Sequence, residues 1–462
     1  MRMRLLALWL LGALGTCGAS AAERPNILVI VADDLGYADL GAYRGAEVAT
    51  PHLDALAASG IRCTSAYVTA PYCSPSRAGL LTGISATRFG HEFNPHVGEE
   101  ATLGLPLNQR TLADELGGAG YATALMGKWH LGFSSAHHPL SRGFHSFVGF
   151  LVGGHNFLLH ADAAPRFGSA HSHDMIYRDR ELQRLDGYTT DLFTDEAIRF
   201  MDARGAEQPW FVCLTYNAVH TPLEMRSEHL TRIPASVSDP ARRGYLSLLL
   251  GLDDAIGRLI EHLRSTGKLN NTLVFFFSDN GGSGHKPFLA YNTGRNAPLR
   301  GDKGQTLEGG IRVPFLIAWP GVVPPGGVFH DPVWTLDVLA TACAAAGTKP
   351  RASVEGVNLL PYLTGAATVP ADRQLAWRFG PQRAIRQGDW KLVDWRDFES
   401  KQQSGWQLYN LATDVGEQHD LASLHPDRVQ QLRKAWDEWN AKNVEPLWRG
   451  SPTEDPLSIV AR

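Results

Sequence analysis

Two pairs of oxygen-bearing side chains follow apolar runs that are typical of buried strands. Asp33 and Asp34 follow the first run, and Asp279 and Asn280 follow a later one. Adjacent carboxylates at the end of a buried strand repel each other and lose hydration, and a bound divalent cation relieves both penalties. Oxygen ligands suit Ca²⁺ or Mg²⁺ and not zinc. These side chains therefore predict a site for one cation, the alternative being that they only cap and turn the chain.

Cys73 is the second feature that could carry chemistry, and it lies in the run Cys73-Ser74-Pro75-Ser76-Arg77. The chain has five cysteines, and an exported protein could pair some of them. Their spacing fits no disulfide framework and no zinc pattern. Cys213 and Cys343 lie in apolar surroundings, which favours buried thiols for both. Taken alone, Cys73 is equally compatible with an unreactive cysteine in a loop or at a helix start.

Short apolar runs predict the strands that must position these groups. The predicted strands are 26–32, 210–216, 272–277 and 313–319. Continuous apolar strands favour a parallel sheet with both faces covered by helices, and Pro314 places the last run near a sheet edge or a strand start. Helix signals separate the strands, at 50–56 behind Thr50 and Pro51, at 111–116 and at 190–204.

This alternation predicts an α/β sandwich. Ligand sites in such sheets lie beyond the carboxyl ends of the strands. Asp33-Asp34, Asn217 with His220, and Ser278-Asp279-Asn280 each follow one of the first three strands. We therefore expect these polar groups to converge at one edge of the sheet.

The pattern changes after about residue 370. Short segments separated by glycines predict an antiparallel sheet, and a helix is predicted at 426–443. The predicted antiparallel strands are 375–379, 383–386, 390–394 and 406–409. We therefore expect a large domain at 22–370 and a small α+β subdomain at 371–462.

The first 21 residues have the pattern of a signal peptide. Arg2 and Arg4 precede a short apolar run, and small residues follow at 19–21. This predicts an exported protein, periplasmic or secreted, with lipidation at Cys17 as the less favoured alternative. No later stretch is long and apolar enough to span a membrane. The net charge of −4 over 462 residues argues against non-specific binding to nucleic acid.

The residues around Cys73 resemble the signature of the type I sulfatases, in which the cysteine of Cys-x-Pro-x-Arg is converted to formylglycine. The resemblance extends from Cys73 through Thr82-Gly83 and continues over most of the chain. Further similar elements are Arg24–Gly36, Thr123–Gly132, Asn217–Leu223, Ser278–Gly281, Leu299–Gly304, Glu308–Pro314, Leu408–Leu411 and Gly416–Leu421. The resemblance implies an alkaline-phosphatase-like fold, in which helices sandwich a large, mixed but mostly parallel sheet.

The resemblance also implies the cofactors and the reaction. A formylglycine-generating enzyme would convert Cys73 to 3-oxoalanine (formylglycine), and the hydrated aldehyde would attack the sulfur of a sulfate ester with help from the cation. One Ca²⁺ is expected, with Mg²⁺ as the alternative. The expected ligands are Asp33, Asp34, Asp279, Asn280 and the modified Cys73.

The remaining roles follow from the matched positions. Arg77 would stabilise the hydrated aldehyde, and Lys128 and Lys303 would bind the sulfate oxygens, where negative charge accumulates. His130 would contact the diol and remove a proton when sulfate is eliminated. His220 would act as the general acid that protonates the leaving alcohol.

The partner is expected to be a sulfated small molecule or a sulfated saccharide. His91 and His155 lie in loops and could bind sugar hydroxyls, although surface histidines without such a role are equally compatible. Asp302 stands where the family often has glycine, and it could pair with Lys303 or point away. The alternatives are a phosphomonoester or phosphonate hydrolase of the same superfamily and a non-catalytic relative that binds sulfated glycans.

Overall fold

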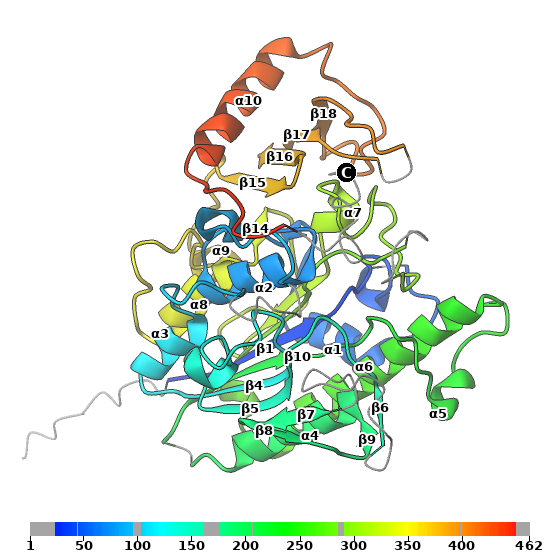
Figure 1. Cartoon of the computed structure of the whole chain (residues 1–462), viewed down its shortest axis with the longest axis vertical. Coiled ribbons are helices and arrows are strands. Elements are labelled where there is room, and N and C mark those ends of the chain that lie inside the picture. Colours follow the sequence, from blue (N-terminus) through cyan, green and yellow to red (C-terminus); the bar gives the residue numbers. More distant parts are fainter. Residues whose placement is uncertain are drawn as a thin grey trace, which may run out of the picture.

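The computed structural model describes residues 24–43, 45–95, 103–160, 175–205, 207–284, 291–397 and 400–449. The predicted signal peptide and Cys17 lie outside these ranges. A large body carries the long sheet, and a smaller layer with α10 (Pro426–Asn440) stands above it (Figure 1).

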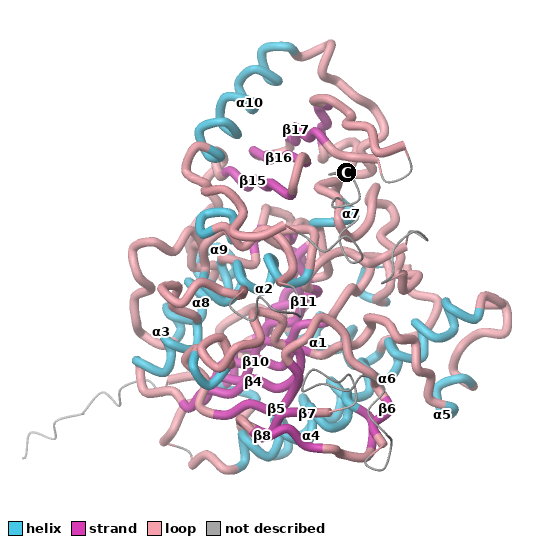
Figure 2. Tube along the Cα trace, viewed as in Figure 1, coloured by secondary structure: helices cyan, strands magenta, loops and turns pink. Residues whose placement is uncertain are grey.

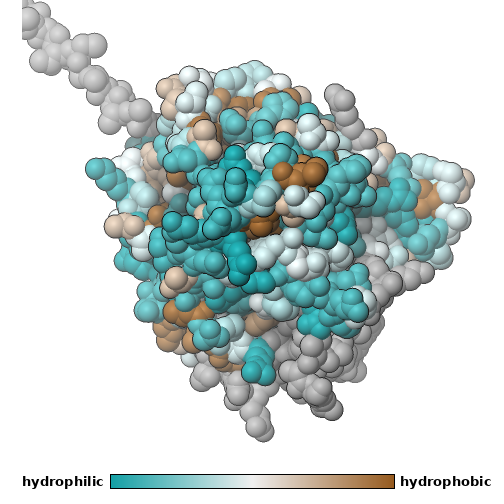
Figure 3. All heavy atoms as spheres, turned by 90° about the horizontal axis from the view of Figure 1, so that it is seen from above, coloured by the Kyte–Doolittle hydropathy of each residue, from teal (hydrophilic) through white to brown (hydrophobic). Residues whose placement is uncertain are grey.

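Among the described residues, no helix combines the length and the apolar character needed to cross a membrane. The face seen from above is mainly hydrophilic, with apolar side chains in small groups (Figure 3).

A ten-stranded sheet runs through the large body (Figure 2). Its strands, in spatial order, are β13 (Gly327–Phe329), β2 (Ile61–Cys63), β12 (Phe315–Ala318), β11 (Thr272–Ser278), β1 (Asn26–Ala32), β10 (Trp210–Thr215), β4 (Ala122–Lys128), β5 (Ser146–Phe150), β7 (Ile176–Arg178) and β8 (Glu181–Gln183). The five strands from β11 to β5 are parallel. β1, β10 and β11 confirm three predicted strands, and all but the first residue of β1 is buried because both faces of the sheet are covered.

The fourth predicted strand runs in the opposite direction to the one expected. β12 pairs with β11 in antiparallel register, with Phe315 opposite Phe277, and lies inside the sheet between β11 and β2. Phe315, the first residue of β12, lies opposite Phe277 near the end of β11, so β12 starts where β11 ends. Pro314 therefore marks a strand start and not a sheet edge.

Helices cover both faces of the sheet. One group of packed helices is α1 (Pro51–Ser59), α4 (Thr189–Asp202) and α6 (Pro240–Ser265); a second group is α2 (Cys73–Thr82), α3 (Leu112–Gly118) and α8 (Asp337–Ala345), and the two lie on opposite sides (Figure 1). The predicted helix starts are confirmed. At α3, the Thr111 side chain accepts from the Asp114 amide while the Asp114 carboxylate accepts from the Thr111 amide.

Short elements complete the large body. They are β3 (Ala66–Tyr67), β14 (Val333–Trp334), β6 (Leu158–Leu159), β9 (Gly187–Tyr188), α5 (Ser227–Leu230), α7 (Glu308–Ile311) and α9 (Leu360–Leu363), with 3-10 turns at Gly41–Tyr43, Ala86–Phe89, Pro139–Ser141 and Leu269–Asn271.

The C-terminal layer is the predicted antiparallel sheet with one helix. Its strands are β15 (Gln374–Phe379), β16 (Gln382–Gln387), β17 (Trp390–Asp394) and β18 (Gln407–Asn410), paired in chain order. α10 buries Leu432 and Trp436 against one face of this sheet. The alternation of apolar residues in the strands supplies that face.

A buried ion cluster joins the C-terminal sheet to the large body. Lys391 on β17 lies 2.9 Å from Glu308 at the start of α7 and 2.8 Å from Glu417, and all three side chains are fully buried. Burial raises the pKa of Glu417 to about 7 despite Lys391. Burial also acts to raise the pKa of Glu308, but Lys391 and Arg312 outweigh it and hold that pKa at about 2.

Lys391→Met is expected to lower the free energy of unfolding by about 3–5 kcal/mol, because it leaves Glu417 buried without its cation. Denaturant unfolding followed by tryptophan fluorescence measures this. The matched control is Lys434→Met, which removes a lysine that is 78% exposed on α10. If the two variants lose equal stability, the cluster does not hold the two layers together.

Candidate active site

Seven of the predicted site residues come from the carboxyl ends of four neighbouring strands. β11, β1, β10 and β4 lie side by side and run parallel, so their ends open onto one edge. The last residues of β1 and β11, Ala32 and Ser278, are in register. The side chains that follow these strand ends are Asp33 and Asp34 after β1, Asp279 and Asn280 after β11, His220 after β10, and Lys128 and His130 at the end of β4.

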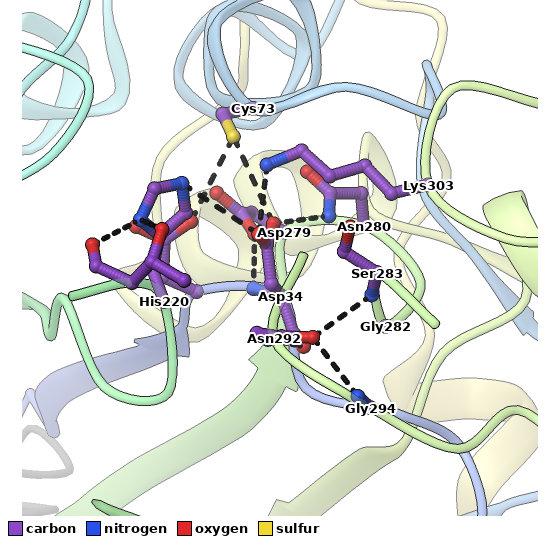
Figure 4. Close-up of polar contacts among 12 residues, drawn as sticks. Asp34, Cys73, His220, Asp279, Asn280, Gly282, Ser283, Asn292, Gly294 and Lys303 are labelled. Atoms are coloured by element: carbon purple, nitrogen blue, oxygen red, sulfur yellow. Dashed lines mark hydrogen bonds and ion pairs between the residues drawn. The ribbon is translucent and has the colours of Figure 1, made fainter. Parts of the chain in front are cut away.

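Acidic and thiol groups form one compact cluster at this edge. One ligand atom from each of Asp33, Asp34, Cys73 and Asp279 lies within 4.8 Å of all the others. The side-chain amide of Asn280 donates to Asp34 Oδ1 at 2.7 Å, while Asn280 Oδ1 is buried without a hydrogen-bond partner among the described residues (Figure 4). Asp34 has φ +61°, a backbone conformation that side-chain-bearing residues rarely adopt outside constrained sites.

Cys73 is the first residue of α2 and points into the acidic cluster (Figure 4). Its Sγ lies 3.7 Å from Asp33 Oδ1 and 3.9 Å from Asp34 Oδ1. Burial raises the pKa of the Cys73 thiol to about 12. The unmodified thiol is therefore protonated at neutral pH and is a poor nucleophile.

Three basic side chains surround the carboxylates. Arg77 contacts Asp279 Oδ2 through both Nε and Nη2 at 2.8 Å. Lys128 lies 2.7 Å from Asp33, and Lys303 lies 2.8 Å from Asp34. All six charged side chains are buried: Arg77, Lys128, Lys303, Asp33, Asp34 and Asp279.

The opposite charges within this group balance in number, and each shifts the pKa values of its neighbours. Burial acts to raise the pKa of Asp33, but Lys128, His220 and Arg77 outweigh it and hold the pKa below its ordinary value. Burial acts to lower the pKa of Lys303, yet Asp34 raises it well above the usual range. Three carboxylates facing three cations leave a formally neutral cluster.

Gly127 brings Lys128 close to the cluster. Gly127 has φ +112°, and a Cβ at this position would lie 1.9 Å from the Thr215 carbonyl oxygen on β10. Glycine is therefore required where β4 passes β10 just before Lys128.

Two histidines lie beside the cluster. His220 Nδ1 donates to the Thr221 carbonyl at 2.7 Å, which leaves Nε2 facing Asp34 Oδ2 at 3.6 Å. Burial lowers the pKa of His220, although Asp33 and Asp34 oppose the effect. Burial, with Lys128 next, holds the pKa of His130 well below its usual value, and His130 Nδ1 has no hydrogen-bond partner among the described residues.

The residues present fit a hard divalent cation. Burial and then Asp33 raise the pKa of Asp279, which is the strain expected of carboxylates crowded without a cation between them. The unpartnered Asn280 Oδ1 adds a neutral oxygen donor to three carboxylates. Such an oxygen-rich set suits Ca²⁺ or Mg²⁺.

The structure places His91 and His155, which were expected in accessible loops, in buried positions. His91 Nε2 lies 2.6 Å from Ser74 Oγ, and burial lowers the pKa of His91 to about 3. Both ring nitrogens of His155 face backbone carbonyls, at 2.8 and 3.1 Å. A loop position in the sequence does not reveal burial, so each histidine looked accessible.

Two further open points are settled by contacts. Asp302 accepts from the Asn296 side-chain amide at 2.9 Å while Lys303 pairs with Asp34, so Asp302 is not the partner of Lys303.

The four described cysteines are all free and buried, which confirms the buried thiols at Cys213 and Cys343. Tyr72 also lies at the site, with its ring centroid 5.1 Å from Lys303 Nζ; an aromatic residue before a motif carries no distinct signal in the sequence.

Comparisons with known proteins agree on one family. A family model described as Sulfatase matches residues 25–348. The chain is 32% identical to N-acetylgalactosamine-6-sulfatase of Mus musculus, over 88% of this chain and 78% of that protein. It is 35% identical to arylsulfatase A of Bos taurus, over 83% of this chain and 78% of that protein.

A solved structure agrees with this match along nearly the whole length. The crystal structure of Ps i-CgsB in complex with k-i-k-neocarrahexaose aligns with a TM-score of 0.86 at 32% identity, covering 95% of this chain and 98% of that one. The fold, the strand-end cluster and these matches lead to one conclusion: the chain belongs to the sulfatase family of the alkaline phosphatase superfamily and is a sulfuric ester hydrolase.

Proposed function

We propose that this enzyme removes sulfate from sulfated saccharides, using formylglycine made from Cys73 and one Ca²⁺ ion, with Mg²⁺ as the alternative. The observation that carries the proposal is the placement of Cys73 against Asp33 and Asp34 inside a ring of buried cations. The saccharide class is supported by a relative named for N-acetylgalactosamine 6-sulfate and by a similar structure that holds a neocarrahexaose.

The proposal assigns the cation to a defined ligand set. Its members are Asp33, Asp34, Asp279, Asn280 and the modified side chain at position 73. Formylglycine supplies a hydrated aldehyde as nucleophile toward sulfur, and the cation supplies positive charge that favours its ionised form. Arg77 neutralises Asp279 and also donates to the Lys128 carbonyl at 3.1 Å, which orients the loop beside the nucleophile.

Lys128 and Lys303 are proposed to bind the sulfate oxygens. Each is buried and ion-paired on one side, so each ammonium keeps further donors for an anion. A dication added to the formally neutral cluster makes the site net positive. An anionic ester is then attracted, and the charge that accumulates on its oxygens is stabilised by groups that are already in place.

His220 is proposed to protonate the leaving alcohol. The Thr221 carbonyl fixes Nδ1 as a donor, so a second proton on Nε2 faces the centre of the site. Asp33 and Asp34 favour that charged form against the effect of burial. His130, neutral and with an unpartnered Nδ1, is proposed to accept a proton when sulfate is eliminated.

The test compares 4-nitrophenyl sulfate with 4-nitrophenyl phosphate, using protein whose residue 73 has been checked by mass spectrometry. Sulfate hydrolysis is expected to be faster, because the cluster offers ligands for one cation and neutralises a monoanionic ester. Faster phosphate turnover would instead support a phosphomonoester or phosphonate hydrolase. Defined sulfated saccharides then identify the sugar and the sulfate position.

Removal of the cation is expected to lower kcat by more than about tenfold, because the site then lacks the positive charge that would favour the ionised nucleophile. EDTA dialysis followed by assay and elemental analysis measures this. Adding Ca²⁺ back should restore activity. Unchanged activity in protein that elemental analysis shows to be free of metal would contradict the cation assignment.

The location of the protein is proposed to be outside the cytoplasm, in the periplasm or secreted. The support is the charged and apolar pattern of residues 1–21, which the described ranges do not include. Mass spectrometry of the mature N-terminus tests it, since cleavage before Ala22 is expected and a lipid on Cys17 would support the alternative.

A further inference from the structure

Two buried asparagines that the sequence did not single out bind the loops that carry the active site. Asn292 is fully buried, and Asn296 is 5% exposed. Both lie in the connection between β11 and β12, after Asn280 and before Lys303. Their side chains contact mainly backbone atoms, so they act on loop geometry and not on substrate.

Asn292 joins three of the strand-end loops. Its side-chain NH₂ donates to the carbonyls of Asp34 at 3.0 Å and Val219 at 3.1 Å. Its Oδ1 accepts from the amides of Ser283 at 3.1 Å and Gly294 at 2.9 Å (Figure 4). The orientation of the amide is unambiguous, because carbonyls only accept and backbone amides only donate.

No other side chain reproduces this set of bonds. The two hydrogens and two lone pairs of the Asn292 amide are all used. Aspartate has the same shape but no hydrogens, and serine reaches fewer partners. Asn292 therefore holds the backbone of the Asp34 loop and that of Val219, the residue before His220, at a fixed separation.

Asn296 makes an equivalent connection to the lysine loop. Its Oδ1 accepts from the Gly282 amide at 2.9 Å. Its Nδ2 lies 3.0 Å from the Gly282 carbonyl, 3.2 Å from the Gly301 carbonyl and 2.9 Å from Asp302 Oδ1. Asn296 thus ties the loop after Asn280 to the two residues that precede Lys303.

The segment between the two asparagines is itself anchored. Arg242 on α6 donates to the Thr293 carbonyl at 2.9 Å, and the Arg295 amide donates to Asp39 Oδ2 at 2.8 Å. Arg242 and Asp39 are both buried and paired with each other. α6 therefore fixes the position of the segment that carries the two asparagines, and the asparagines in turn hold the strand-end loops.

We propose that Asn292 and Asn296 are positioning residues for sulfate ester hydrolysis. Asn292 fixes the position of His220 relative to Asp34. Asn296 fixes the position of Lys303 relative to the Asp279-Asn280 loop. This rests on the proposed roles of His220 and Lys303. Because wild type and His220→Gln are assayed alongside, a failure of those roles is seen separately from a failure of the positioning.

The Asn292 test uses Asn292→Ala, with Asn292→Ser as the milder variant if the first does not fold. For a sugar sulfate, whose alcohol needs protonation, kcat is expected to fall on the order of 100-fold, because a small misplacement of a catalytic group is costly. For 4-nitrophenyl sulfate, whose leaving group needs little protonation, the fall should be about tenfold smaller. The rise in Tm that Ca²⁺ gives to EDTA-treated protein should also shrink, since Asp34 is displaced.

The Asn296 test uses Asn296→Ala, with Asn296→Ser as its milder form. KM and the inhibition constant of inorganic sulfate are expected to rise about tenfold or more, with a smaller change in kcat. The reason is that the loop carrying Lys303 is no longer held in place, whereas the position of His220 is unchanged. The Asn292 variant should lose mainly kcat, and the Asn296 variant should mainly gain in KM. General destabilisation of the fold cannot produce this difference between the two variants.

Thr341→Val is the matched control. Thr341 is fully buried on α8 and accepts from the Leu359 amide at 2.9 Å, so the variant also loses a buried hydrogen bond to backbone. It should lower Tm with kcat and KM within threefold of wild type. The proposal is overturned if the asparagine variants behave like this control, or if the Asn292 variant loses the same factor on both substrates.

Discussion

Cys73→Ala is expected to lower kcat/KM for an aryl sulfate by at least about 10⁴-fold while the fold stays intact, because it removes the proposed nucleophile. Cys73 is the only described cysteine that the structure places against the carboxylate cluster. Its thiol has a pKa raised by burial to about 12, so the unmodified side chain cannot replace the aldehyde. Steady-state assays of wild type and variant, with circular dichroism to check folding, measure the effect.

Cys213→Ala is the matched control for this variant. Cys213 is also buried, with its thiol pKa raised by burial to about 12, but it lies within β10 and not at the strand end. The control should keep nearly full activity. Substantial residual activity in Cys73→Ala, in protein shown by mass spectrometry to carry alanine, would remove the formylglycine mechanism.

His220→Gln is expected to lower kcat for a sugar sulfate by about 10²–10⁴-fold, because the alcohol must be protonated as it leaves. The loss for 4-nitrophenyl sulfate should be much smaller, since that leaving group departs as a stable anion. The glutamine side chain keeps a polar group near Asp34 but cannot transfer a proton at neutral pH. Assaying both substrates with wild type and variant gives the ratio that defines a general acid.

His262→Gln controls for loss of a histidine elsewhere. His262 lies on α6 and pairs with Asp202 at 2.9 Å, away from the strand-end loops. Its replacement should leave both substrates unaffected. Equal losses on both substrates in His220→Gln would assign His220 to substrate binding or to packing.

The meeting of these carboxylates could be predicted from local sequence because of a simple rule. Polar residues directly after apolar strands lie at the carboxyl edge of a parallel sheet, and the neighbouring ends of β1 and β11 brought Asp33, Asp34 and Asp279 together. The helix and strand boundaries could also be predicted, because they depend on capping residues and apolar periodicity, which are set by neighbours a few residues away. The antiparallel C-terminal sheet followed from the same local signals.

The direction of β12 and the burial of His91 and His155 could not be predicted in this way. Strand direction depends on which edge of the sheet a long connection returns to, and β12 starts beside the end of β11. Burial of a loop histidine depends on segments far away in sequence. His91, for example, packs its ring against Trp448.

The sequence by itself determined the chemistry that is available: the carboxylates, the cysteine within its motif, and the lysines and histidines that accompany them. Residue type and spacing suffice for this, because they depend only on neighbours along the chain. Only the tertiary structure decided how these groups face one another and what holds them, including Asn292 between Asp34 and Val219. Such a contact joins loops from three different strands, and a single sequence carries no signal for a bond between backbone atoms and a distant amide.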